Sequence, residues 1–146
     1  MTIQLYQESY RDDLIFMVLQ AKDALGRKPT INEDLLDIRR NYLDKGDLFW
    51  VAIDEADRVI GCIGYSRTEN PTEAFLHRLY VKPSMQRMGI GTALLQTAER
   101  EMLCRGITVS LVHLGEPKEQ WQASYHFYPK HGYQEWKPRY MRKELK

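Results

Sequence analysis

Two glycines one residue apart, Gly89 and Gly91, open a stretch with helical periodicity in the segment QRMGIG at 86–91. Glycine is a poor residue with which to begin a helix unless another molecule must approach the backbone closely. The first amides of a helix have no internal acceptors, and the helix dipole adds partial positive charge there. A phosphate can therefore lie against these amides, with Arg87 adding a full charge and Gln86 a neutral donor. The pattern indicates a phosphate-binding loop.

The loop matches neither of the two common nucleotide-binding fingerprints. A dinucleotide-binding G-x-G-x-x-G needs a third glycine where Leu94 stands, and it follows its strand directly. A Walker loop needs Gly-Lys-Ser or Gly-Lys-Thr, which the chain does not contain. Two glycines alone also fit a tight helix entry without a ligand, so the loop by itself leaves the ligand open.

Bulk properties limit the class of protein. The chain has 146 residues, 43% of them hydrophobic and 28% charged, with a net charge of +1, which favours one domain over 1–146 with a buried core. This balance argues against disorder and against a nucleic-acid binder. No apolar run of membrane-spanning length and no secretion signal is apparent. Cys62 and Cys104 lack metal-type spacing, so we expect a reduced, cytoplasmic protein without a metal or a membrane anchor.

Periodicity places the loop among alternating strands and helices. Strands are expected at 2–6, 48–55, 59–69, 74–81, 107–114, 133–136 and 139–145. Helices are expected at 12–25, 32–46, 89–105 and 118–128. This order predicts an α/β fold built around one sheet.

The strand that precedes the loop is irregular. Its aliphatic residues Leu76, Leu79 and Val81 are spaced three and then two apart, whereas a regular strand keeps a spacing of two. An extra residue near His77 and Arg78, a β-bulge, accounts for the spacing and leaves backbone groups unpaired. A strand with aliphatic residues on both faces is the alternative.

The segment LHRLYVKPSMQRMGIGTALL resembles motif A of the GCN5-related N-acetyltransferases (GNAT). The signature Q/R-x-x-G-x-G/A corresponds to Gln86, Gly89 and Gly91. The segment FYPKHGY at 127–133 resembles the next motif of the family, a helix that ends in Tyr followed by Gly and an aromatic residue. The element order matches from Thr2 to Leu145. The resemblance implies a mixed, mostly antiparallel sheet, splayed between the fourth and fifth strands and flanked by helices.

The resemblance also implies acetyl-coenzyme A as the acetyl donor. Its pantetheine arm would pair with the backbone of Leu79 and Val81, in a wedge that the bulge opens. Its pyrophosphate would lie on the amides from about Met88 onward. The residues of the loop that would bind the donor are Gln86, Arg87, Met88, Gly89, Ile90, Gly91 and Thr92. A preference for another acyl-CoA stays open.

Direct transfer of the acetyl group to a primary amine of a small molecule or peptide is the implied reaction. An alkyl ammonium has a pKa of about 10, so the site must remove a proton from it and return one to the thiolate. Tyr128 aligns with the general acid of the family, although Trp121 stands where an Asn often contacts the cofactor. For the base, His77 at the predicted bulge has a near-neutral ordinary pKa, and Glu73 or a water relay competes.

The acceptor is open among polyamines, aminoglycosides, amino acids and peptide N-termini, and the motifs do not decide between monomer and homodimer. Residues 1–76 hold 9 basic and 14 acidic residues (net −5), and residues 77–146 hold 12 and 6 (net +6). This split favours a cationic amine if carboxylates face the cleft. The candidate carboxylates are Glu33, Asp34, Asp37, Glu69 and Glu73. A module that binds acetyl-CoA without turnover is the alternative function.

Overall fold

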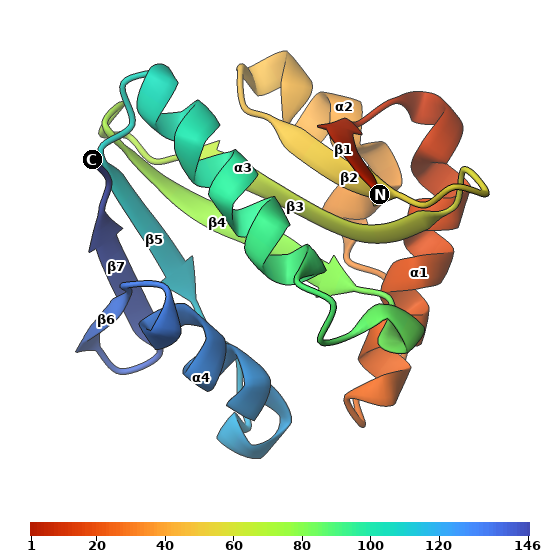
Figure 1. The fold of residues 1–146 in the computed structure, drawn as a ribbon. Helices are drawn as coiled ribbons and strands as arrows, with labels where there is room; N and C mark the ends of the chain where they lie inside the picture. Colours follow the sequence, from red (N-terminus) through yellow and green to blue (C-terminus); the bar gives the residue numbers. More distant parts are fainter.

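The computed structural model describes residues 1–146 and contains one seven-stranded sheet in the order β1-β2-β3-β4-β5-β7-β6 (Figure 1). The strands are β1 (Thr2–Leu5), β2 (Phe49–Ile53), β3 (Val59–Arg67), β4 (Glu73–Val81), β5 (Val109–His113), β6 (Gln134–Lys137) and β7 (Tyr140–Glu144). The α-helices are α1 (Arg11–Ala24), α2 (Ile38–Asn41), α3 (Ile90–Cys104) and α4 (Gln122–Lys130). The 3-10 turns are η1 (Glu8–Tyr10), η2 (Glu33–Asp37), η3 (Leu43–Lys45), η4 (Pro83–Met85) and η5 (Lys118–Trp121). The α/β prediction is confirmed.

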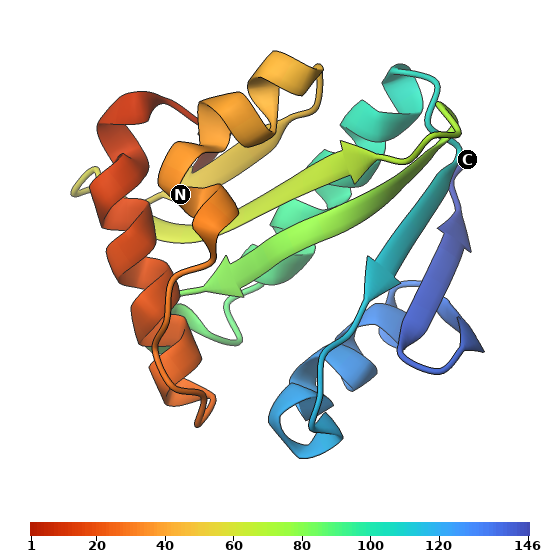
Figure 2. The ribbon, with the colours of Figure 1, turned by 180° about the vertical axis from the view of Figure 1, so that it is seen from behind.

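The sheet is splayed between β4 and β5, as predicted. These two strands form the only parallel pair, and just three residue pairs join them, from Glu73–Val109 to Phe75–Leu111. Beyond Phe75, β4 runs on to Val81 without β5 beside it. Figures 1 and 2 show the resulting wedge, with β1–β4 on one side and β5, β7, β6 and α4 on the other.

The predicted bulge lies in β4. Tyr80 is paired with Cys62 and His77 with Gly64, so two residues of β4 oppose the single residue between Cys62 and Gly64. One of those two, Arg78, has a left-handed backbone with φ of 58°. A bulge bends its strand and interrupts the ladder, here the ladder with β3, and this one lies just past Phe75, the last residue of β4 that is paired with β5.

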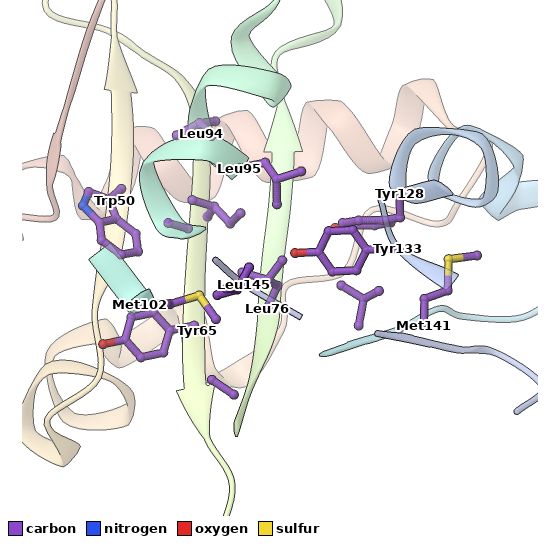
Figure 3. Packing of buried hydrophobic residues seen from close by; sticks show 14 of the residues in the cluster. Trp50, Tyr65, Leu76, Leu94, Leu95, Met102, Tyr128, Tyr133, Met141 and Leu145 are labelled. Atoms are coloured by element: carbon purple, nitrogen blue, oxygen red, sulfur yellow. The ribbon is translucent and has the colours of Figure 1, made fainter. Parts of the chain in front are cut away.

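Two apolar clusters cover the two faces of the sheet. The cluster on the α3 and α4 face includes Leu94, Leu95, Tyr128 and Tyr133, which come together as Figure 3 shows. In α3 the buried residues recur at helical spacing, which fastens that helix to the sheet. The second cluster packs α1, η2 and α2 on the other face of β2 and β3.

The helix predicted over 32–46 is wrong as a continuous element. The chain forms η2, α2 and η3 in succession, with α2 only four residues long. Asp37 has non-helical backbone angles (φ −145°, ψ 76°), and its side chain accepts a hydrogen bond from the amide of Arg40. Short acidic side chains favour such caps over helix interiors, so the segment restarts at Asp37.

Candidate active site

The loop before α3 presents a row of free amides. The first helical hydrogen bond runs from the amide of Ala93 to the carbonyl of Gly89, and no amide of residues 87–92 donates to a protein acceptor. Gly89 has φ of 79°, and a Cβ added there would meet no atom within 4 Å. Arg87 also has a left-handed backbone, with φ of 64°. The amides are therefore open to an anion at the positive end of the helix dipole.

A groove of about 560 Å³ leads from these amides along β4. Its walls include Leu79 and Val81 of β4, Phe127 of α4 and Ala24 of α1. The side-chain amide of Gln86 donates to the carbonyl of Val81 at 3.1 Å and so fastens the loop to the end of β4. The groove thus has a strand edge on one side and the free amides of the loop at one end.

The structure brings most of the sequence-predicted donor residues together in this groove. The ones that line it are Leu79, Val81, Gln86, Arg87, Gly89, Ile90, Gly91 and Thr92. Met88 is not among the lining residues, and its side chain is 66% exposed. Sequence reasoning missed Lys130, Ser124 and the small residues of α1; the signal for Lys130 was its place inside the FYPKHGY motif.

A second cavity of about 120 Å³, called here the inner cavity, lies where β4 and β5 diverge. The bulged part of β4, the end of β5 and Trp121 form its walls. Tyr128 lines both the groove and the inner cavity, together with Leu25, Leu79 and Tyr80. Tyr128 therefore stands at the junction of the two spaces.

The hydroxyl of Tyr128 is buried in an aromatic cluster and is free of hydrogen bonds to the protein. The residue is only 6% exposed, and its ring packs edge-on against Phe127 and Tyr133 with centroids at 5.2 and 5.3 Å. The hydroxyl makes no hydrogen bond within the protein. Burial raises its pKa well above the ordinary value, and Tyr80 adds to the rise. The group is therefore protonated at neutral pH, and no protein acceptor engages its proton.

The two sequence-predicted bases lie in different places. His77 is half-buried and lines the inner cavity beside the bulge. Burial lowers its pKa, and the charge of Arg78 lowers it further, so the imidazole is neutral at pH 7. Glu73 lies at the joined end of β4, opposite Val109, and lines neither space. Only His77 shares the inner cavity with Tyr128.

A half-buried ion pair that sequence reasoning missed joins η2 to the bulge. The guanidinium of Arg78 donates from two nitrogens to the carboxylate of Asp34, at 2.8 and 3.0 Å, and the hydroxyl of Tyr42 donates to the same carboxylate at 2.6 Å. Burial would raise the pKa of Asp34, but the hydrogen bonds from Arg78 and Tyr42 hold it below its ordinary value. The left-handed Arg78 is thereby fixed in place.

The expectation that a cluster of carboxylates faces the cleft is wrong. None of the five candidate acidic residues lines the groove or the inner cavity. Asp34 is paired with Arg78, and Asp37 caps α2. The charged residues that line the inner cavity are Arg27 and Arg78. The net charge of half of the sequence did not predict the charge of the cleft, because the fold pairs acidic side chains with distant basic ones.

Three further properties bear on the class of site. No three side chains among His, Cys, Asp and Glu lie together where they could hold a metal ion. None of the helices combines the length and the apolar character that crossing a bilayer needs. Cys62 is buried as a free thiol, and its sulfur lies 3.1 Å from the carbonyl of Arg78. Burial raises the pKa of that thiol to about 12, which makes it a packing residue.

Comparison with known proteins agrees with this geometry. The model of the acetyltransferase (GNAT) family matches residues 4–133. An acetyltransferase of the GNAT family from Staphylococcus aureus has 25% identity and a TM-score of 0.90, with 99% of each chain covered. An aminoglycoside 6'-N-acetyltransferase complexed with coenzyme A has 21% identity and a TM-score of 0.76, over 100% of this chain and 98% of that one. The PaiA N-acetyltransferase of Thermoplasma acidophilum, in complex with coenzyme A, has 21% identity and a TM-score of 0.72, with 99% of each chain covered. Comparison with curated proteins gives no match.

Proposed function

The chain belongs to the acetyltransferase (GNAT) family, and from that premise we propose that it moves an acetyl group from acetyl-coenzyme A directly to a primary amine. The observation that carries the proposal is the position of Tyr128, which lines both the groove and the inner cavity, while the free amides lie at the far end of the groove. A long donor fits the groove, and the reacting end of the amine fits the cavity. The acceptor class is a small molecule or a peptide.

The groove supports a coenzyme A thioester in particular. Its anion site would take the pyrophosphate, with Arg87 and Lys130 among the residues of its wall. The backbone of Leu79 and Val81 has no β5 partner, so its polar groups can pair with the amides of an extended pantetheine arm. Two of the similar structures hold coenzyme A, which is compatible with this assignment.

The reaction proceeds in steps that the residues at the junction can serve. His77, neutral at pH 7, takes a proton from the ammonium group, and the freed amine attacks the thioester carbonyl carbon. A backbone amide freed at the bulge, near Arg78 and Leu79, steadies the negative carbonyl oxygen. The C–S bond then breaks, and the thiolate of coenzyme A takes the proton of Tyr128. The acylated nitrogen gives up its second proton, which returns through water to the Tyr128 oxygen, and His77 releases the first proton to solvent. The products are the acetamide and the free thiol.

A thiol-release assay over a panel of amines, with acetyl-CoA and with or without the protein, tests the reaction. Gly89→Asp tests the donor site by calorimetry, because it puts a carboxylate where phosphate belongs; we expect binding of acetyl-CoA to be lost. Gly106→Asp is the matched control, since Gly106 also has a left-handed backbone (φ 84°) and open space around it, beyond the other end of α3. Unchanged affinity in Gly89→Asp contradicts the proposed donor site. Donor binding without thiol release for any amine supports a sensing module instead.

A further inference from the structure

The side of the inner cavity that faces α1 carries more positive than negative charge. Arg27 and Arg78 line the cavity, and Lys22 of α1 lies within electrostatic range of both. Asp34 is the one carboxylate among them, and its two oxygens are taken by Arg78. Lys22 is 6% exposed and donates to the carbonyl of Thr30, without a carboxylate partner. Of these three cations, Lys22 and Arg27 therefore have no counter-charge.

Arg27 has an unused donor at this cavity. Its guanidinium stacks on the ring of Trp121, 3.7 Å from the centroid, and one terminal nitrogen donates to the carbonyl of Gln120 at 3.1 Å. Its Nε–H is buried and makes no well-aligned hydrogen bond, although the hydroxyl of Tyr80 lies near enough to interact with the guanidinium. A buried donor without a partner costs free energy, and a buried charge without a counter-charge costs more. The stack on Trp121 also fixes the direction of the guanidinium, which suits recognition of a planar anion.

The phosphates of the donor do not supply the missing charge. Arg27 lines the inner cavity and not the groove that ends at the free amides of the loop. The thioester end of the donor would reach Tyr128, where the groove and the inner cavity meet, while its phosphates stay at the far end of the groove. The anion that completes the cluster must therefore arrive with the acceptor.

We propose that the acceptor is a primary amine that also carries a carboxylate, which Arg27 binds at the inner cavity. This inference rests on the proposed function, because it names the acceptor of the same reaction. A guanidinium matches a carboxylate through charge-assisted hydrogen bonds. The volume of about 120 Å³ is several times the roughly 10–15 Å³ that holds one water, so the cavity has room for part of a small ligand. Polyamines would meet the repulsion of uncompensated cations there.

Pairs of free L-amino acids and their α-amides test the proposal, because each pair shares one amine and differs in the carboxylate. Affinity for the protein saturated with coenzyme A is measured by calorimetry, and kcat and KM by thiol release with acetyl-CoA. We expect at least one acid to bind more than about tenfold tighter than its amide, the scale of one hydrogen bond to a charged group. Arg27→Gln should raise KM for the acid to that for its amide, with little change in kcat. Arg27→Lys should keep part of the preference for the acid.

Two controls keep a folding defect apart from a lost contact. Lys28→Gln removes the same charge from the neighbouring exposed residue and should leave the preference unchanged. Acetyl-CoA affinity should be unaltered in every variant, because the groove is separate from Arg27.

The outcomes separate this inference from the proposed function. Equal use of acids and amides, or a polyamine as the best acceptor, overturns the inference and leaves the acetyl transfer standing. If O-phosphoethanolamine binds more tightly than any amino acid, the group that Arg27 recognises is not a carboxylate, and the inference is overturned. Binding of an acid that depends on Arg27, without turnover of any amine, supports the inference and overturns the proposed function.

Discussion

Replacing Tyr128 by phenylalanine separates chemistry from stability in this protein. The hydroxyl has no hydrogen-bond partner within the protein, and the ring alone makes the contacts with Phe127 and Tyr133. The substitution therefore breaks no intramolecular hydrogen bond and leaves no buried group unpaired. We expect the free energy of unfolding to change by less than about 1 kcal/mol, the net worth of one ordinary hydrogen bond.

Turnover should respond very differently. Loss of a general acid costs about 10²–10⁴-fold in rate. At about 1.36 kcal/mol per tenfold, this raises the barrier by roughly 2.7–5.4 kcal/mol. The assay is thiol release with the best amine of the panel, with acetyl-CoA affinity from calorimetry as the check that the donor still binds. Because burial raises the pKa of Tyr128, kcat of the unaltered protein should not fall as pH approaches 10, the ordinary pKa of tyrosine.

Tyr133→Phe is the matched control on the same aromatic cluster. The hydroxyl of Tyr133 lies 2.7 Å from that of Ser110 and donates to Glu99 at 2.8 Å, so its removal leaves two buried groups short of a partner. We expect a stability loss of about 1–3 kcal/mol with kcat retained. The general-acid assignment is refuted if Tyr128→Phe turns over as fast as the unaltered protein, or if both variants lose kcat and stability in parallel.

Three further predictions follow from the ionisable groups. In the unaltered protein, kcat should fall on the acid side below pH 6.5, because the pKa of His77 is lowered. His77→Gln should abolish this fall. If the variant and the unaltered protein have the same pH profile, His77 is not the base. Asp34→Asn should lower the free energy of unfolding, measured with urea, by about 1–3 kcal/mol. This is less than for a fully buried pair, because the side chains of Asp34 and Arg78 are 24% and 31% exposed. An unchanged unfolding midpoint contradicts this prediction. Stability should fall by roughly 1.4 kcal/mol per pH unit above about pH 9, where the Cys62 thiol ionises in the unfolded chain but stays protonated in the folded one. Above about pH 10 the hydroxyl of Tyr133 should add a similar slope, because burial raises its pKa too. Thermal melts from pH 7 to 11 measure this fall, and a flat profile refutes it.

Local pattern was enough to predict the features that depend on neighbouring residues. The spacing of Leu76, Leu79 and Val81 predicted the bulge, and the two glycines predicted open amides before α3. The splay of the sheet came from the family resemblance rather than from periodicity.

Features that depend on distant partners could not be found in this way. Asp34 counted as a free carboxylate in the sequence, yet Arg78, 44 residues away, neutralises it. Arg27 gave no signal, because its place at the inner cavity depends on a contact with Gln120, 93 residues away. The charge of a cleft follows from which side chains pair, and a sum over half of the sequence does not contain that information.

The wedge between β4 and β5 gives this protein a strand edge in its interior. Edges at the border of a sheet invite pairing with other chains, and the border strand β6 here is short and exposed over all four of its residues. The edge of β4 beyond Phe75 is walled instead by α4 and the loop before α3. Paired strands lie about 4.8 Å apart, so a single extended molecule fits along that edge, whereas a folded neighbour would collide with α4. The protein can thus keep a backbone ladder open for recognition without offering it as a nucleus for aggregation.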